Sequence, residues 1–141
     1  MEETRILINA SPAEVWEVLA DIQNWPTWAP TVTSVTTTAT DLVVGTTAEL
    51  KQPKIPTAIW TVTSAEPGRG FTWSSRSNGV VTTAEHELHP GDSGTEVVLR
   101  ITHTGAMAFL ARLFGGRMTK SYLKQEAEGL KARVEQGRSR K

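Results

Sequence analysis

The chain has 141 residues, of which 38% are hydrophobic and 21% charged, and its 15 basic and 15 acidic side chains leave no net charge at pH 7. This length is typical of one domain around a single core, so we expect residues 1–141 to form one domain. The balanced charge argues against nucleic-acid binding, which needs a concentrated positive surface, and the absence of cysteine excludes disulfide bonds and Cys-ligated metal sites.

The start of the chain lacks the features of a signal peptide, because residues 1–5 do not provide a basic flank before an apolar stretch. The longest apolar stretch, residues 106–111, is far shorter than the roughly 20 residues of a membrane-spanning helix. We therefore expect a cytoplasmic protein that does not insert stably into a membrane.

A strand and two short helices are predicted near the N-terminus. Residues 3–9 alternate in the manner of a strand, with Ile6 and Ile8 on one face. Ser11-Pro12-Ala13-Glu14 then provides a capping box with proline at the first helical position, so a helix should begin at Pro12. Apolar residues form one stripe that should face the core: Val15, Trp16, Val18, Leu19 and Ile22. Two prolines within residues 24–30 limit the next segment to a second short helical turn.

A sheet is predicted between residue 31 and about residue 104, where Thr and Val dominate and their branched side chains favour strands. Turn-forming residues divide this region into six strands. The clearest turn is Asn78-Gly79, a pair that tolerates the positive φ angles of a two-residue hairpin. No connection is long enough for a crossover helix, so the sheet should be an antiparallel meander.

A long helix is predicted for residues 117–134. Apolar residues recur on it at spacings of four, three and four, and this stripe should face the sheet: Leu123, Ala127, Leu130 and Val134. Met118 and Tyr122 lie at one edge of the stripe. Gly115-Gly116 precedes it, and because each glycine costs about 1 kcal/mol relative to alanine inside a helix, we expect a kink or a short break there.

Two histidines are candidates for contact with a ligand. His86 and His89 are three residues apart, which places them on opposite faces of a strand, so they cannot share a metal ion. His86 shares its face with small or apolar residues, and we expect it either to meet a ligand or to be a half-buried histidine satisfied by a neighbour. His103, at the end of the last strand, could reach the same interior space or close its rim.

The five tryptophans are a second source of candidate site residues. Trp60, Phe71 and Trp73 stand on strand faces near His86, and in a curved sheet they would either line a cavity or fill the space under the helix. The sequence contains no dinucleotide, P-loop, zinc-protease, serine-hydrolase or EF-hand motif. We therefore assign no cofactor, no metal ion and no catalytic residue.

Four segments carry a resemblance to a known family: residues 8–16, 21–28 and 60–73, and the strand of His86 with residues 94–97. Together with the order of predicted elements, they resemble the START/Bet v 1-like (SRPBCC) superfamily, specifically its polyketide cyclase/dehydrase-type branch, over nearly the whole chain. The resemblance implies an α+β helix-grip fold. In this fold a curved seven-stranded antiparallel sheet wraps around a long C-terminal helix, with two short helices after the first strand.

The resemblance also implies a cavity between sheet and helix that holds hydrophobic ligands such as lipids, sterols or polyketides. We expect a monomer or homodimer that binds a small hydrophobic or aromatic ligand, in a site made of Trp60, Phe71, Trp73, His86, His103, Met118 and Tyr122. One alternative is a polyketide cyclase or aromatase that uses a cavity histidine for proton transfer. A further alternative makes residues 106–114 a lid, or a contact for a partner or membrane surface, hinged at Gly115-Gly116.

Overall fold

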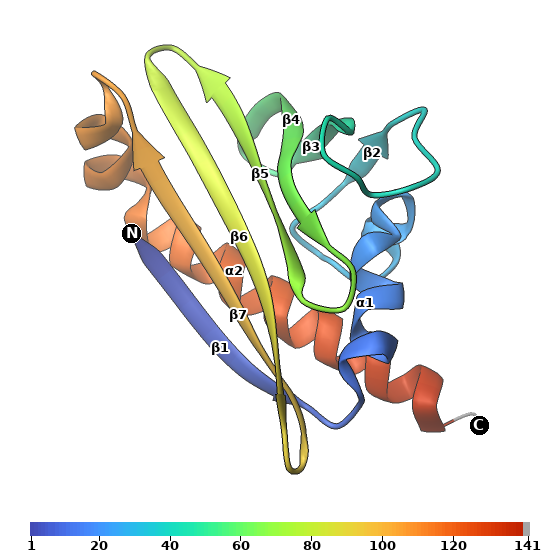
Figure 1. Ribbon diagram of the computed structural model, residues 1–141. Coiled ribbons are helices and arrows are strands. Elements are labelled where there is room, and N and C mark those ends of the chain that lie inside the picture. The colour runs from blue at the N-terminus through green and yellow to red at the C-terminus, as the bar shows by residue number, and fades with distance from the viewer. Residues whose placement is uncertain (140–141) are drawn as a thin grey trace.

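The computed structural model describes residues 1–139. The elements in chain order are β1 (Glu2–Ile8), α1 (Pro12–Ala20), the 3-10 helix η1 (Ile22–Thr27), β2 (Ser34–Thr36), β3 (Thr47–Gln52), β4 (Ile55–Glu66), β5 (Gly70–Ser77), β6 (Val80–Gly91), β7 (Gly94–Thr104) and α2 (Ala108–Ser139). The strands form one seven-stranded antiparallel sheet in the order β1-β7-β6-β5-β4-β3-β2, and α2 lies across one face of it (Figure 1). This arrangement confirms the predicted helix-grip fold.

The first helix begins where the sequence predicts, at Pro12. The Ser11 hydroxyl accepts a hydrogen bond from the Glu14 N–H at 3.2 Å, and the Glu14 carboxylate accepts one from the Ser11 N–H at 3.2 Å. These two bonds satisfy backbone donors that would otherwise lack partners at the helix start. The Trp25 indole N–H donates to the Leu19 carbonyl at 2.9 Å, so η1 is held against the end of α1.

Local backbone chemistry gives the sheet its hairpins and its curvature. Asn78 and Gly79 have φ angles of 50° and 79°, which form the predicted tight turn between β5 and β6. The pairing register shifts between Leu50 and Gln52 and again between Val62 and Ser64, and such irregularities bend and twist a strand. The pairing of β4 with β5 begins at Thr61, which lies opposite Ser74. Residues 55–60 of β4 have no pairing with residues 75–77 of β5. The sheet therefore opens between these two strands at one end.

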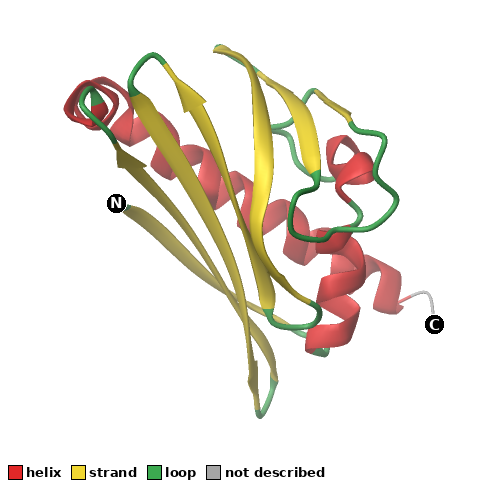
Figure 2. Cartoon of the chain, turned by 45° about the horizontal axis from the view of Figure 1, so that its top comes forward, coloured by secondary structure: helices red, strands yellow, loops and turns green. Residues whose placement is uncertain are grey.

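Of the kink or short break predicted at Gly115-Gly116, the break is absent, because α2 runs through both glycines without interruption. Figure 2 shows its first turns nearly along their axis, whereas the rest of the helix crosses the view, so the helix changes direction without losing its continuity. The cost of two glycines is small beside the hydrogen bonding and packing of a helix of 32 residues. No helix among residues 1–139 is long and apolar enough to cross a membrane.

The core occupies the space between α1, the sheet and the C-terminal half of α2. The predicted stripe of α2 is buried in it, with Leu123, Ala127, Leu130 and Val134 all at most 5% exposed. Gly129 allows α2 to approach η1 closely, since a Cβ atom at this position would overlap the carbonyl oxygen of Trp28. Buried side chains therefore fill the space under the C-terminal half of α2, and the open space lies toward the start of this helix.

Candidate functional site

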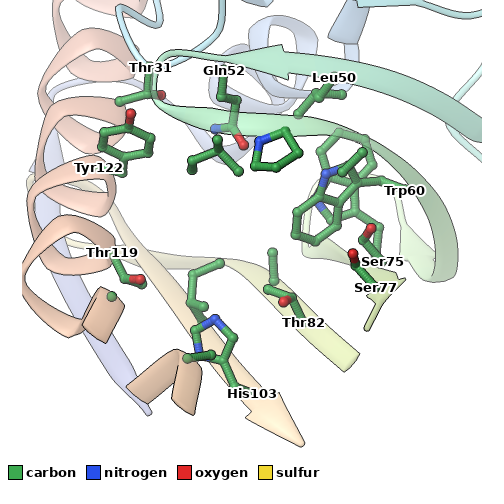
Figure 3. A pocket seen from close by; sticks show the side chains of 18 of the residues that line it. Thr31, Leu50, Gln52, Trp60, Ser75, Ser77, Thr82, His103, Thr119 and Tyr122 are labelled. Atoms are coloured by element: carbon green, nitrogen blue, oxygen red, sulfur yellow. The ribbon is translucent and has the colours of Figure 1, made fainter. Parts of the chain in front are cut away.

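A cavity of about 660 Å³ lies between the concave face of the sheet and the first half of α2. Its volume falls within the range of about 300–1,000 Å³ that is usual for small-molecule sites. Side chains from β3 to β7 line it, and α2 contributes residues between Leu110 and Glu126 (Figure 3). The lining that α2 contributes ends at Glu126, and beyond it Ala127, Leu130 and Val134 are buried in the core.

The structure brings together most of the residues that the sequence predicts for the site. Six of the seven line the cavity: Trp60, Trp73, His86, His103, Met118 and Tyr122. Phe71 does not line it. Its ring lies behind His86, stacked on the imidazole with 4.1 Å between ring centroids and 9° between planes, and is 2% exposed. Strand alternation correctly predicts that Phe71 lies on the inner face of the sheet. Its ring, however, is packed within the core and does not border the cavity.

Tryptophan rings make up one side of the cavity. Trp60 and Trp73 lie with their ring centroids 5.5 Å apart, and Trp25 contacts Trp73 at 5.2 Å. The indole N–H of Trp60 is buried and has no hydrogen-bond partner within the described part of the chain. This side of the cavity therefore offers broad aromatic surface.

His86 is buried at the inner end of the cavity, where it is 4% exposed. Its Nδ1 lies 3.2 Å from the carbonyl oxygen of Phe71, and its Nε2 lies 3.5 Å from Oε1 of Glu126 on α2. We call these two residues the His86–Glu126 pair. Oε1 of Glu126 is buried and, among residues 1–139, has no hydrogen-bond partner. The inner end of the cavity thus places an imidazole and a carboxylate face to face.

Glu126 is not among the residues predicted for the site, although the sequence contains a signal for it. Glu126 follows Leu123 by three residues and precedes Ala127, so it lies beside the apolar stripe of α2. A charged side chain is uncommon at such a position unless it has a partner. Hydroxyl residues also surround the cavity, and of these only Thr82 is expected from the sequence, on the same strand face as His86. Figure 3 shows Ser75, Ser77, Thr82 and Thr119 around the space, and these add polar groups between the apolar surfaces.

Tyr122 connects α2 to the opposite side of the cavity. Its hydroxyl donates a hydrogen bond to the carbonyl oxygen of Pro53, in the turn between β3 and β4. Figure 3 shows the Tyr122 ring at the edge of the space, near Thr31 and Gln52. This contact holds the β3–β4 hairpin against the helix and so closes one flank of the cavity.

Paired charges gather on the outer face of the sheet, away from the cavity. Arg100 donates hydrogen bonds to Glu3 and Glu87, and Arg5 donates to Glu3. Bonds from Arg100 and then Arg5 lower the pKa of Glu3, and a hydrogen bond from His89 is the main cause that lowers the pKa of Glu87. These side chains occupy strand positions that alternate with the inward-facing ones, so they support the sheet and do not reach the site.

The comparison with protein families agrees with this geometry. The family described as polyketide cyclase / dehydrase and lipid transport matches residues 2–135. The chain belongs to this family. No curated protein sequence matches the chain.

Solved structures show the fold that this member of the polyketide cyclase/dehydrase family shares with others. The di-domain ARO/CYC StfQ from the steffimycin biosynthetic pathway superposes with a TM-score of 0.77 at 15% identity, over 97% of this chain and 51% of StfQ. The protein TTHA0849 from Thermus thermophilus gives 0.76 at 17% identity, over 96% and 97% of the two chains. Ara h 8.0201 gives 0.72 at 11% identity, over 94% and 95%. The chain thus spans about half the length of StfQ, and at these identities the likeness concerns the fold alone.

Proposed function

We propose that the protein binds a small hydrophobic or aromatic molecule, lipid-like or polyketide-like, in the cavity between the sheet and α2. The observation that carries this proposal is a cavity of about 660 Å³ bordered by Trp25, Trp60 and Trp73. At about 30 Å³ per molecule, such a space would hold on the order of 20 waters. An apolar ligand that replaces them gains the hydrophobic contribution of its own buried surface and of the three indole rings.

A matched pair of variants on α2 tests this proposal. Thr119 borders the cavity, whereas the next residue, Lys120, is exposed to solvent. Thr119→Trp should fill part of the space and weaken binding of the neutral apolar dye N-phenyl-1-naphthylamine at least tenfold. Lys120→Trp adds the same side chain outside the cavity and should change the affinity less than twofold. Dye fluorescence titrations measure both, and circular dichroism checks that both variants fold.

Two results would contradict binding in this cavity. One is equal dye affinity in the Thr119→Trp variant, the Lys120→Trp variant and the unaltered protein. The other is native mass spectrometry that detects no complex with the dye or with any of a panel of fatty acids, sterols and polycyclic aromatics.

A second candidate function is a polyketide cyclase or aromatase, and the His86–Glu126 pair favours it. An imidazole 3.5 Å from a carboxylate can take a proton from a bound substrate and return it at another atom. His86→Phe would keep a ring stacked on Phe71 and remove the proton-transferring nitrogen. With a flexible poly-β-ketone substrate, loss of cyclised product at unchanged dye affinity is the expected result for an enzyme. Equal product formation in the variant would exclude this candidate.

A further inference from the structure

The orientation of the His86 imidazole is defined by its neighbours. Its Nδ1 lies 3.2 Å from the carbonyl oxygen of Phe71, and because a carbonyl oxygen only accepts hydrogen bonds, Nδ1 carries the proton. The ring stacks on Phe71 and contacts the rings of Trp25 and Trp73. These contacts leave Nε2 directed at Glu126 of α2, as the atom available for other chemistry.

The atom that faces His86 Nε2 is a carboxylate oxygen, which accepts hydrogen bonds as an unprotonated Nε2 does. Oε1 of Glu126 lies 3.5 Å away, beyond a normal hydrogen bond, and is a buried acceptor without a partner among the described residues. A neutral imidazole with its proton on Nδ1 presents a lone pair at Nε2, and an ionised carboxylate presents only lone pairs. With the imidazole neutral and the carboxylate ionised, the inner end of the cavity contains two converging acceptors and lacks a donor.

A hydroxyl group supplies what this arrangement lacks. Because Oε1 of Glu126 is buried, a hydroxyl reaches it only when the Glu126 side chain turns toward the cavity, and the hydroxyl oxygen can then lie about 2.8 Å from both Oε1 and His86 Nε2. If Nε2 is unprotonated, the hydroxyl donates to either acceptor. If Nε2 holds a proton, the hydroxyl accepts from Nε2 and donates to Oε1. An ether or a ketone can only accept, so it leaves Glu126 unsatisfied, and an unsatisfied buried group is costly.

The structure points to ligands with a phenolic or enolic hydroxyl, and we propose that this hydroxyl binds between His86 Nε2 and Glu126 Oε1 at the inner end of the cavity. This inference rests on the proposed binding function and adds the chemical class of the ligand. The apolar part of the ligand would then lie along Trp60 and Trp73, which border the same space. Because the pair sits at the closed end, the hydroxyl enters first and the rest of the molecule points toward the mouth.

Three naphthalenes of nearly equal size test the proposal: 2-naphthol, 2-methoxynaphthalene and 2-ethylnaphthalene. The dissociation constant of each is measured by titration of tryptophan fluorescence or by calorimetry. Transfer from water disfavours the hydroxyl compound, so without a specific partner it should bind no more tightly than its methyl ether. We expect the opposite in the unaltered protein, with 2-naphthol bound at least tenfold more tightly than 2-methoxynaphthalene.

Variants at the pair should reduce this preference. In Glu126→Leu and in His86→Phe, the advantage of 2-naphthol over the methyl ether should fall well below tenfold, because each variant removes one of the two partners of the hydroxyl, while 2-ethylnaphthalene still binds and so shows that the cavity is intact. Glu128→Leu removes a carboxylate from the exposed side of the same helix and should keep the tenfold preference. If Glu126→Leu does not fold, Glu126→Gln replaces it, because the amide can donate to Nε2 and should reduce the preference.

The outcomes separate this inference from the proposed function. If none of the three compounds binds the unaltered protein, the binding function itself is contradicted. If all three bind but 2-naphthol has no advantage, the function stands and the hydroxyl site is wrong. The hydroxyl site is also wrong if the full tenfold advantage of 2-naphthol persists in both Glu126→Leu and His86→Phe.

Discussion

Glu135 joins the last part of α2 to the end of β1. Its Oε2 accepts hydrogen bonds from the Asn9 N–H at 2.9 Å and from the Lys131 ammonium at 2.6 Å. The bond from Asn9, and then the bond from Lys131, lower the pKa of Glu135. Lys131 also donates to the carbonyl oxygen of Leu7 at 2.7 Å, so two side chains of the helix hold the strand end.

Replacement of Glu135 by Gln should lower the free energy of unfolding at pH 7 by about 1 kcal/mol, since charge-assisted hydrogen bonds at a partly exposed site contribute about this much. The pKa of Glu135 is lower in the folded state than in the unfolded state, so its contribution is present above the unfolded pKa of about 4.3 and is lost as the pH falls through the folded value. Urea unfolding between pH 7 and pH 3 measures this. The difference between the two proteins should shrink below about pH 4.

A control comes from Glu128, whose pair with Lys124 is exposed and 4.0 Å long. Glu128→Gln should change stability by less than about 0.5 kcal/mol at either pH. A pH-independent loss in Glu135→Gln would contradict the assignment to the ionised carboxylate.

The site residues themselves differ in how far the sequence could predict them. Trp60, Trp73 and His86 follow from strand alternation, which determines the face on which a side chain lies. Phe71 shares that face but lies too deep to meet the cavity. Glu126 could be found only as a charged residue inside an apolar helical stripe, and its partner His86 is 40 residues away in the sequence.

At the scale of elements, Gly129 determines how closely α2 approaches Trp28, the residue that follows η1. A Cβ atom there would overlap the Trp28 carbonyl oxygen and approach the Trp28 ring, so the helix would have to move. Gly129→Ala should therefore destabilise the protein, even though alanine favours a helix by about 1 kcal/mol relative to glycine. The expected result is a loss of more than about 1 kcal/mol, measured by urea or thermal unfolding.

Gly137 on the same helix provides the matched control, because a Cβ atom there meets open space. Gly137→Ala should stabilise the protein by up to about 1 kcal/mol through helix propensity alone. If both substitutions stabilise the protein equally, the close approach of Gly129 to Trp28 does not constrain the fold.

The long helix also decides between two outcomes that the sequence left open. The pair Gly115-Gly116 predicts a kink or a break, and the structure has a change of direction within one unbroken helix. The lid alternative depended partly on residues 112–114, whose side chains lie outside the described part of the chain. Helix propensity gives only the free-energy cost of each glycine. Whether the helix ends at the glycines depends on the hydrogen bonding and packing of the whole helix.

For the molecule as a whole, the cavity results from unequal packing along α2. Toward the C-terminus, small and apolar residues of the helix meet the sheet and α1 directly. Toward the start of the helix, the sheet opens between β4 and β5, and the bond from Tyr122 to Pro53 connects the helix to a hairpin across the space. The core therefore fills one end of the fold and leaves a ligand-sized volume at the other.

The sequence by itself determined the start of α1, the β5–β6 hairpin, the antiparallel meander and the buried stripe of α2, because capping, turn chemistry and periodicity act over a few residues. Only the tertiary structure decided which inward-facing residues border a cavity and which are packed, and that His86 meets Glu126. The physical reason is that periodicity specifies a direction from the backbone. How deeply a side chain is buried, and which side chain it meets, depend on the distance between the helix and the curved sheet.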